Sequence, residues 1–252
     1  MARTVVITGA ASGIGKATAA LAEARGWQPI RADLNEGDVK ADLATPQGRA
    51  AFVDGVTALL GERLDAVIAC AGVALPMPLT VKVNYFGAVA TLEGLRPLLA
   101  KGNLPRAVGI TSFASIMPAD SELIEACLSG DEAVALEIAE SKNPAVYYSS
   151  SNAAFARWMR RQAITADWVR TGILLNGIAP GMVVTPMTQA MVDDKAVRAQ
   201  LEQAMPIGRD ARPEEMAELL LWLASPANSM MVGQVIFIDG GAEATVRGDT
   251  LW

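Results

Sequence analysis

The first feature with recognisable chemistry is a glycine-rich turn, followed by a carboxylate about 18 residues further along the chain. The segment TGAASGIG (residues 8–15) follows a short apolar run and opens a helical pattern. Glycines at positions 9, 13 and 15 let the backbone turn tightly and approach a pyrophosphate, which a helix N-terminus stabilises through its free N–H groups and dipole. Asp33 ends the next apolar run, where an acid accepts hydrogen bonds from an adenosine ribose. Together these residues predict a dinucleotide site.

The residues around this turn also indicate which dinucleotide binds. The carboxylate of Asp33 would repel a 2′-phosphate on the adenosine ribose. Ser12 and Leu34, the neighbouring positions, offer no cation that could hold such a phosphate. We therefore expect NAD(H) rather than NADP(H).

The composition excludes several classes of function. Hydrophobic residues make up 52% of the 252 residues and charged residues 19%, which is enough apolar material for a sizeable core. The net charge of −6 argues against a nucleic-acid surface and against attraction to an anionic membrane. The chain has no histidine, which removes His-based metal sites and catalytic triads, and no metal is expected.

The cysteines and the N-terminal segment bear on the cellular compartment. Cys70 and Cys127 are too few for a disulfide framework, so we expect free thiols in a reducing compartment. No signal peptide is recognisable before the first strand-like run, and no apolar run is long enough to span a membrane. These features predict a cytoplasmic protein.

Strand-like and helix-like segments alternate along the chain, which predicts a single α/β domain over residues 1–252 with a parallel sheet covered on both faces. The glycine-rich turn should open a helix that Gly26 closes, and Thr45 should cap a helix reaching Leu60. Further helices are expected near residues 80–100, from about Tyr147, and near 213–224. The strand-like runs are residues 3–7, a run ending near Asp33, 39–43, 64–72, 107–111, 173–180 and 233–240.

Residues 115–146 interrupt this regular alternation. They carry ELIEACL and DEAVALEIAE, whose apolar spacing is helical. A bare loop of this length would be unusual, so we expect a small helical insertion before the helix at Tyr147. Three roles remain open for the insertion: it has no function beyond adding surface structure, it acts as a lid, or it changes how subunits pack.

The motifs resemble those of the short-chain dehydrogenase/reductase family almost from end to end, which implies a Rossmann-type doubly wound sheet. TGAASGIG resembles its cofactor signature, CAG (70–72) its NAG, VNYFG (83–87) its helix asparagine, ITSFAS (110–115) its serine segment and NGIAPG (176–181) its nicotinamide segment. Within the family, bacterial 3α-hydroxysteroid dehydrogenase/carbonyl reductases are most similar, followed by coniferyl-alcohol dehydrogenase-like members.

The resemblance implies a hydride transfer between a secondary alcohol or ketone and nicotinamide. Ser112 would polarise the carbonyl, Tyr148 would exchange the proton and Asn84 would order a proton-relay water. The residues implied to bind NAD are Gly9, Ser12, Gly13, Ile14, Gly15, Asp33, Asp42, Leu43, Ala71, Gly72, Pro180, Gly181, Val183 and Thr185.

The chain departs from the family at one catalytic position. The family's YxxxK motif places a lysine on the same helix face as the tyrosine, where its ammonium lowers the pKa of the phenol. Here Tyr148 is followed four residues later by Asn152, and Tyr147 by Ser151. We favour Tyr148 and Asn152 because SSSNAAF resembles the family's SxSKAAL, while Tyr147 and Ser151 remain the alternative. Without the lysine the phenol should stay protonated at neutral pH, which impairs oxidation more than reduction.

Three hypotheses follow. The first is an NAD-dependent dehydrogenase or reductase, either impaired by one substitution or tolerant of it. The second is a catalytically silent NAD-binding module, and the third is lyase or dehalogenase chemistry, against which the intact cofactor motif counts.

The remaining signals concern substrate and assembly. Met182, Met187, Met191 and Met205 flank the nicotinamide segment. They suit an apolar ketone or alcohol as substrate, and core filling explains them equally well. The apolar helix near 213–224 and the last strand resemble the family's dimer surface, which implies a homodimer or homotetramer.

Overall fold

The expected strands form a single parallel sheet in this computed structural model, which describes residues 2–250 except for the side chains of residues 197 and 200–203. The seven strands are β1 (Thr4–Thr8), β2 (Gln28–Asp33), β3 (Val39–Lys40), β4 (Ala66–Ala69), β5 (Arg106–Ile110), β6 (Leu174–Pro180) and β7 (Val235–Ile238). Their order is β3-β2-β1-β4-β5-β6-β7, and every neighbouring pair is parallel. This confirms the expected doubly wound α/β fold.

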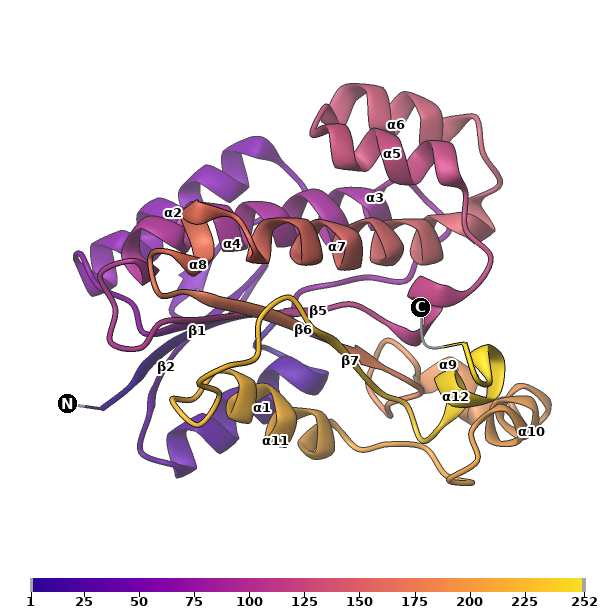
Figure 1. Ribbon diagram of the computed structural model, residues 1–252. Coiled ribbons are helices and arrows are strands. Elements are labelled where there is room, and N and C mark those ends of the chain that lie inside the picture. Colours follow the sequence, from indigo (N-terminus) through magenta and orange to yellow (C-terminus); the bar gives the residue numbers. More distant parts are fainter. Residues whose placement is uncertain (1, 251–252) are drawn as a thin grey trace.

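Helices cover both faces of the sheet (Figure 1). One face carries α1 (Gly13–Ala24) and α11 (Pro213–Leu223), and the other carries α2 (Pro46–Leu60), α4 (Ala88–Leu99), α7 (Tyr147–Ala163) and the short α8 (Ala166–Val169). Side chains alternate between the two layers: along β1, Val6 joins the core under α2, α4 and α7, whereas Val5 and Ile7 join the core under α1 and α11. Burial on both faces explains why the strands are apolar throughout.

The predicted helix ends at α1 and α2 are confirmed. The hydroxyl of Thr45 accepts a hydrogen bond from the N–H of Gly48 at 3.0 Å, which caps α2. Helix α1 ends at Ala24, and Gly26 follows with a φ of +74°. Such a left-handed residue closes the helix and turns the chain into β2.

Two elements differ from expectation. The strand expected over 39–43 ends at Lys40, because the carboxylate of Asp42 accepts the N–H of Ala44 at 2.9 Å and turns the chain. The helix expected over 80–100 is divided into α3 (Leu79–Val81), a π-helical segment η1 (Lys82–Gly87) and α4. A π segment accommodates an extra residue in the helix and changes which side chains face one side.

The insertion is a helical hairpin. A 3₁₀ turn, η2 (Phe113–Ile116), leads into α5 (Ser121–Ser129) and α6 (Glu132–Glu140), and a second 3₁₀ turn, η3 (Pro144–Val146), leads into α7. Asp120 and Asp131 cap the two helices through their side chains. The hairpin lies against one end of α7, away from the sheet (Figure 1).

Three helices from the C-terminal part of the chain lie near the carboxyl edge of the sheet. They are α9 (Gln189–Asp193), α10 (Lys195–Ala204) and α12 (Ala242–Arg247), which lie together at one side of the molecule (Figure 1). Over the described residues, no helix is both long and apolar enough to cross a membrane.

A pair of glycines brings α7 close to the sheet. Gly109 of β5 pairs with Gly177 of β6, and both lie under Met159 of α7. A Cβ atom on Gly177 would lie 2.7 Å from the Met159 methyl carbon, which is far inside van der Waals contact. We therefore expect Gly177→Ala to lower the free energy of unfolding by about 1–3 kcal/mol, measured by urea denaturation.

A double-mutant cycle with Met159 supplies the control. Met159→Ala alone should cost about 2–5 kcal/mol because it leaves a cavity. In the double variant, the methyl group that Gly177→Ala adds occupies part of that cavity. The double variant should therefore lose less free energy of unfolding than the two single variants lose in sum. Strictly additive costs would show that the two positions do not compete for the same space.

Candidate active site

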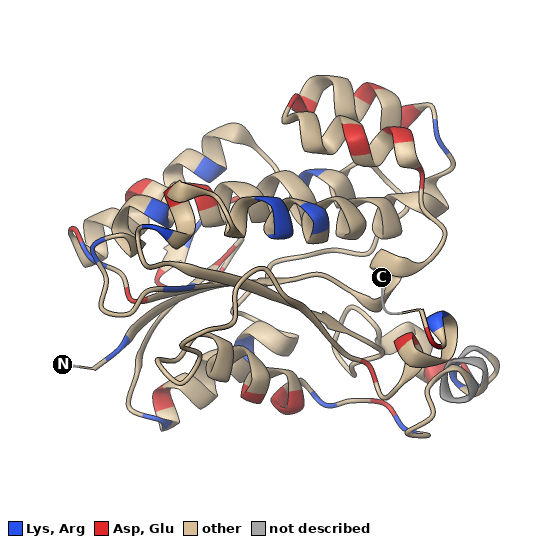
Figure 2. Ribbon diagram, in the orientation of Figure 1, with Lys and Arg blue, Asp and Glu red and all other residues tan. Residues whose placement is uncertain are grey.

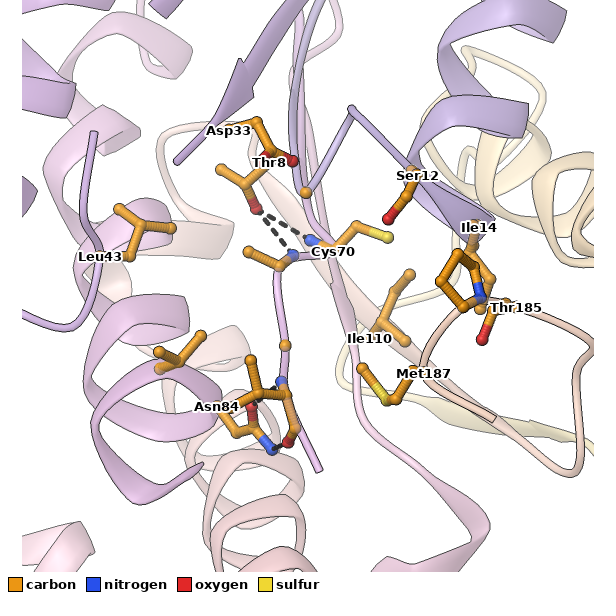
Figure 3. Close-up of a pocket in the computed structure, with 18 of the residues that line it drawn as sticks. Thr8, Ser12, Ile14, Asp33, Leu43, Cys70, Asn84, Ile110, Thr185 and Met187 are labelled. Carbon is orange, nitrogen blue, oxygen red and sulfur yellow. Dashed lines mark hydrogen bonds between the residues drawn. The ribbon is translucent and has the colours of Figure 1, made fainter. Parts of the chain in front are cut away.

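One cavity of about 390 Å³ lies at the carboxyl edge of the sheet, where the chain order reverses between β1 and β4 (Figure 3). Ligands of open α/β sheets bind in this crevice. All residues that the sequence analysis assigns to the cofactor or to the chemistry line this cavity: Gly9, Ser12, Gly13, Ile14, Gly15, Asp33, Asp42, Leu43, Ala71, Gly72, Asn84, Ser112, Tyr148, Asn152, Pro180, Gly181, Val183 and Thr185.

The glycine-rich turn is a closely packed backbone cradle. Gly9 has a φ of +68°, and a Cβ atom there would lie 2.9 Å from the Cα of Ala71. A Cβ atom on Gly15 would lie 2.2 Å from the carbonyl oxygen of Gly9. These contacts leave no room for side chains, so the backbone itself forms the floor of the cavity.

The N-terminus of α1 adds hydrogen-bond donors to this floor. Ser12 is the N-cap residue with an extended backbone, but its side chain makes no capping hydrogen bond. Its hydroxyl lies in the cavity near Ile14 and Thr185 (Figure 3). The first N–H groups of a helix lack partners within the helix, so this end suits a phosphate.

Asp33 lies at the end of β2 and is oriented by the backbone. Its two carboxylate oxygens accept hydrogen bonds from the N–H groups of Ala11 at 3.0 Å and Leu34 at 2.8 Å. A carboxylate oxygen can accept more than one hydrogen bond, so each retains capacity for a ribose hydroxyl. The side chain is therefore preorganised as an acceptor at this end of the cavity.

Thr8 is a lining residue that the sequence analysis did not single out. Its hydroxyl accepts the N–H groups of Cys70 at 3.0 Å and Ala71 at 3.1 Å, which joins the end of β1 to the turn after β4 (Figure 3). Its position directly before Gly9 in the glycine-rich segment is the signal that could have identified it.

Asn84 lies in the π segment and faces the turn after β4. Its side-chain oxygen accepts the N–H of Val73 and its side-chain nitrogen donates to the carbonyl of Val73, both at 2.8 Å. The side chain therefore holds this turn, while its second amide hydrogen and a second lone pair on its oxygen remain available towards the cavity.

Ser112 and Tyr148 approach each other from β5 and α7. The Ser112 hydroxyl caps η2 by accepting the N–H of Ala114 at 3.1 Å. Burial raises the pKa of the Tyr148 phenol above its ordinary value, and a hydrogen bond with Ser112 acts in the opposite direction. Burial is the larger effect, so the phenol is neutral at pH 7 and acts there as a hydrogen-bond donor.

The alternative pair, Tyr147 and Ser151, does not line the cavity. The Tyr147 hydroxyl donates to the carbonyl of Ala139 in α6 at 2.7 Å, inside the interface with the insertion. Ser151 is fully buried, and its hydroxyl donates to the carbonyl of Tyr148 at 3.1 Å. Both side chains are thus engaged in packing α7.

Asn152 lies one turn after Tyr148, at the position where the favoured alignment expects the lysine of the family motif. Its side-chain nitrogen donates to the carbonyl of Tyr148 at 2.8 Å, and its backbone carbonyl accepts the hydroxyl of Thr111 at 3.0 Å. One amide hydrogen and the side-chain oxygen remain for the cavity. The amide therefore offers a donor and an acceptor but no charge, where a lysine would supply a cation.

The charge of the cavity is one-sided. Its charged lining residues, as far as the structure describes them, are Asp33 and Asp42, with no lysine or arginine among them. The arginines that follow on α7 are directed elsewhere: Arg157 pairs with Glu125 at 3.4 Å, and Arg160 donates to the carbonyl of Gly233 at 3.4 Å. Neither arginine lines the cavity.

The loop after β6 closes the other side of the cavity. The hydroxyl of Thr188 accepts the N–H of Thr185 at 3.0 Å and is hydrogen-bonded to the Thr185 hydroxyl at 3.1 Å. Thr188 was missed in the sequence because it lies beyond the PGxxxT segment. Of the four methionines expected to form a substrate surface, only Met187 lines the cavity, and Met205 is buried in the protein.

Cys70 lines the cavity but lacks the features of a nucleophile. Both cysteines are free thiols, as expected. Burial, reinforced by the charge of Asp33, raises the pKa of the Cys70 thiol to about 12. A thiol with such a raised pKa stays protonated at neutral pH and acts as a small apolar group.

Comparisons with known proteins place the chain in a family. A family model described as enoyl-(acyl carrier protein) reductase matches residues 132–243. The 3-alpha-hydroxysteroid dehydrogenase/carbonyl reductase of Comamonas testosteroni is 37% identical, over 96% of this chain and 97% of its own length. The cis-4-hydroxycyclohexanecarboxylate dehydrogenase of Sinomonas cyclohexanicum is 33% identical over the same shares of the two chains.

A solved structure agrees with these relatives. The 3-alpha-hydroxysteroid dehydrogenase from Pseudomonas sp. B-0831, in complex with NADH, superposes with a TM-score of 0.92 at 39% identity and covers 98% of this chain and 100% of that one. The chain therefore belongs to the short-chain dehydrogenase/reductase family of oxidoreductases and is related to its 3α-hydroxysteroid dehydrogenase/carbonyl reductase members.

Proposed function

We propose that this protein is an NAD(H)-dependent oxidoreductase that interconverts bulky apolar ketones and secondary alcohols, and that it favours reduction at neutral pH. The observation that carries the proposal is that one cavity has the glycine cradle and Asp33 at one end and Ser112 with Tyr148 at the other. The solved relative in complex with NADH supports the same choice of cofactor.

The cavity fits a dinucleotide at the level of its residues. The cradle around Gly9 and Gly15 and the N-terminus of α1 suit a pyrophosphate. The preorganised carboxylate of Asp33 suits the hydroxyls of an adenosine ribose and disfavours a 2′-phosphate. When bound, the nicotinamide would supply or accept the hydride of the reaction.

The protein's own part of the chemistry is to hold oxygen and move a proton. The hydroxyl of Ser112 would donate a hydrogen bond to the substrate's carbonyl oxygen, where negative charge develops. The neutral phenol of Tyr148 would deliver its proton to that oxygen during reduction. In the oxidative direction the same phenol must first lose its proton, and burial without a neighbouring cation disfavours this.

The substrate end of the cavity supports an apolar ligand. Met187 lines it, and large apolar side chains remain exposed on the segments that continue from Val73 and Ser112. They are Leu75, Met77 and Met117, each at least 40% exposed. Flexible apolar side chains of this kind adapt to a broad range of bulky substrates. The names of the related enzymes, which act on steroid and cyclohexane rings, support the same class.

A second candidate, a silent NAD-binding module, is favoured by one observation: the described lining of the cavity contains no cation to assist Tyr148. Such a module would act through its contacts with another copy of the chain. The half-buried strand β7 ends the sheet, and Trp222 of the neighbouring helix α11 is 41% exposed. We infer a homodimer through this surface for either function.

Restoring the lysine separates the two candidates. Asn152→Lys should raise the turnover of apolar ketones with NADH at pH 7 by about 100-fold, because an ammonium near the phenol and the ribose contributes several kcal/mol at an effective dielectric of about 20. Ketone reduction followed by NADH absorbance measures this. Ser151→Lys is the control and should give no gain, because position 151 faces the helix packing.

An inactive Asn152→Lys variant that still binds NADH would favour the silent module. A gain in Ser151→Lys alone would instead show that Tyr147 is the reacting phenol.

The direction of the reaction should depend on pH. Since the pKa of Tyr148 is raised, the phenol is protonated over the neutral range and alcohol oxidation should rise tenfold per pH unit towards pH 10, while ketone reduction stays nearly constant. In Asn152→Lys the ammonium lowers that pKa, so the rise in oxidation should shift to lower pH. Initial rates with NAD and an alcohol between pH 7 and 10 test this; identical profiles in the two proteins would contradict it.

The choice between NAD(H) and NADP(H) should depend on Asp33. We expect Asp33→Ala to weaken NADH binding about tenfold through the loss of charged hydrogen bonds, and Asp33→Ala with Leu34→Arg to improve NADPH binding. Fluorescence titration with each dinucleotide measures both. Asp38→Ala is the matched control, because Asp38 also accepts a backbone N–H but does not line the cavity. Equal losses at positions 33 and 38 would assign the effect to the backbone.

A further inference from the structure

Arg49, near the start of α2, lies behind the wall of the cavity formed by the loop after β3. Its Nε donates to the carbonyl of Leu43 at 2.8 Å, and its Nη2 donates to the carbonyls of Ala44 and Lys82, both at 3.4 Å. Leu43 lines the cavity, opposite Ser12 and Thr185 (Figure 3). One guanidinium group therefore joins the loop that carries Leu43 to the π segment that carries Asn84.

The loop has little freedom to move away from this guanidinium group. On its other side Leu43 packs against Gly87 of the π segment, where an added Cβ atom would lie 3.1 Å from both the Cβ and the carbonyl oxygen of Leu43. The carboxylate of Asp42 turns the chain by accepting the N–H of Ala44. The position of Leu43 thus depends on the donor that holds its carbonyl.

The orientation of Arg49 comes from the insertion. Glu132, the first residue of α6, receives two hydrogen bonds from the guanidinium group, at 2.6 and 2.8 Å. The side chains of Arg49 and Glu132 are only 11% and 22% exposed, so solvent and salt screen this pair weakly. The guanidinium carbon also lies 5.8 Å from the centre of the Phe86 ring. A bidentate arginine–carboxylate pair fixes both the position and the plane of the guanidinium group.

We propose that Glu132 and Arg49 are positioning residues for the adenine end of the dinucleotide, so that the insertion supports cofactor binding. Glu132 orients Arg49, and Arg49 holds the carbonyl of Leu43, which keeps the Leu43 side chain in the cavity wall. This rests on the proposed function, in which Asp33 binds the adenosine ribose. The N–H of Ala41 donates to the carbonyl of Asp33 at 3.0 Å, so the wall formed by Asp42 and Leu43 lies beside the end assigned to the adenosine. The role differs from the lid and the subunit-packing device considered from the sequence.

A second ion pair of the same hairpin provides a matched comparison. Glu125 of α5 pairs with Arg157 of α7 at 3.4 Å, and these side chains are 60% and 51% exposed. This pair also fastens the insertion to the body of the protein, but neither residue lines the cavity. The hairpin carries several further acidic residues on its outer surface (Figure 2), so the loss of one negative charge is a small change in its overall charge.

The experiment measures binding of three ligands: NADH by fluorescence titration, and AMP and nicotinamide mononucleotide by competition. Glu132→Gln keeps the size of the side chain but removes its charge and one acceptor, so we expect about tenfold weaker binding of NADH and AMP with unchanged binding of nicotinamide mononucleotide. Arg49→Lys keeps the charge but cannot reach both Glu132 and Leu43, and should behave in the same way. Glu125→Gln should bind all three ligands like the unaltered protein.

The possible outcomes are distinct. Unchanged affinity for NADH and AMP in Glu132→Gln would overturn the positioning role. An equal loss of affinity for nicotinamide mononucleotide would also overturn it, because it would indicate a general destabilisation of the cavity. An equal loss of NADH and AMP affinity in Glu125→Gln would also overturn the positioning role. It would show that any attachment of the hairpin affects cofactor binding, and not specifically the contact of Glu132 with Arg49. If the unaltered protein binds no NADH, the proposed function fails and the inference fails with it, whereas the other outcomes leave the proposed function intact.

Discussion

The structure depends on one topological constraint, the reversal of strand order between β1 and β4. Because the chain leaves these two strands in opposite directions, their carboxyl ends diverge and leave a crevice that no side chain of the sheet fills. The crevice stays open only if the backbone around it packs closely, as it does where Gly9 meets Ala71 and Gly15 meets Gly9. The hydroxyl of Thr8, which accepts two N–H groups of the turn after β4, holds the two edges at a fixed separation. The positions of the segments that line the crevice all depend on this reversal of strand order.

The electrostatics of the crevice are unusual for the chemistry that its geometry supports. Two carboxylates line it, and the described lining contributes no positive side chain to balance them. The helix N-terminus at Ser12 supplies partial positive charge at the pyrophosphate end, but this effect decays within the first turn of the helix and does not extend to Tyr148. Burial raises the pKa of the Tyr148 phenol, the hydrogen bond with Ser112 offsets only part of this, and the phenol stays neutral at pH 7. A neutral phenol is a suitable acid and a poor base, which is the physical reason to expect that the proposed reaction is faster towards reduction at neutral pH.

Much of this arrangement could be predicted from the sequence, because the motifs that carry the site lie at strand and helix ends. The glycine-rich turn, Asp33 and the helix start at Tyr147 are local signals whose positions follow from periodicity and spacing. Tyr147 and Tyr148 could not be separated with certainty, since adjacent helix residues differ only in the face they present, and that face is decided by packing against α6. Residues such as Thr8, Thr188 and Arg49 were missed because they act through backbone groups distant in sequence. Such contacts leave no pattern along the chain.

The insertion shows how a segment without motif residues can influence a site. Its two helices are capped by Asp120 and Asp131, so the hairpin is well defined locally. A well-defined hairpin can fix the positions of the residues that it contacts. Two of its attachments are physically different: the Tyr147 hydroxyl joins α6 to the start of α7, next to Tyr148, and Glu132 joins it to Arg49, behind the cavity wall that carries Leu43. A rigid element fastened at both points resists separation of the two ends of the cavity. Preorganisation of this kind lowers the entropic cost of binding a long ligand, which is the physical reason to expect the insertion to affect cofactor affinity.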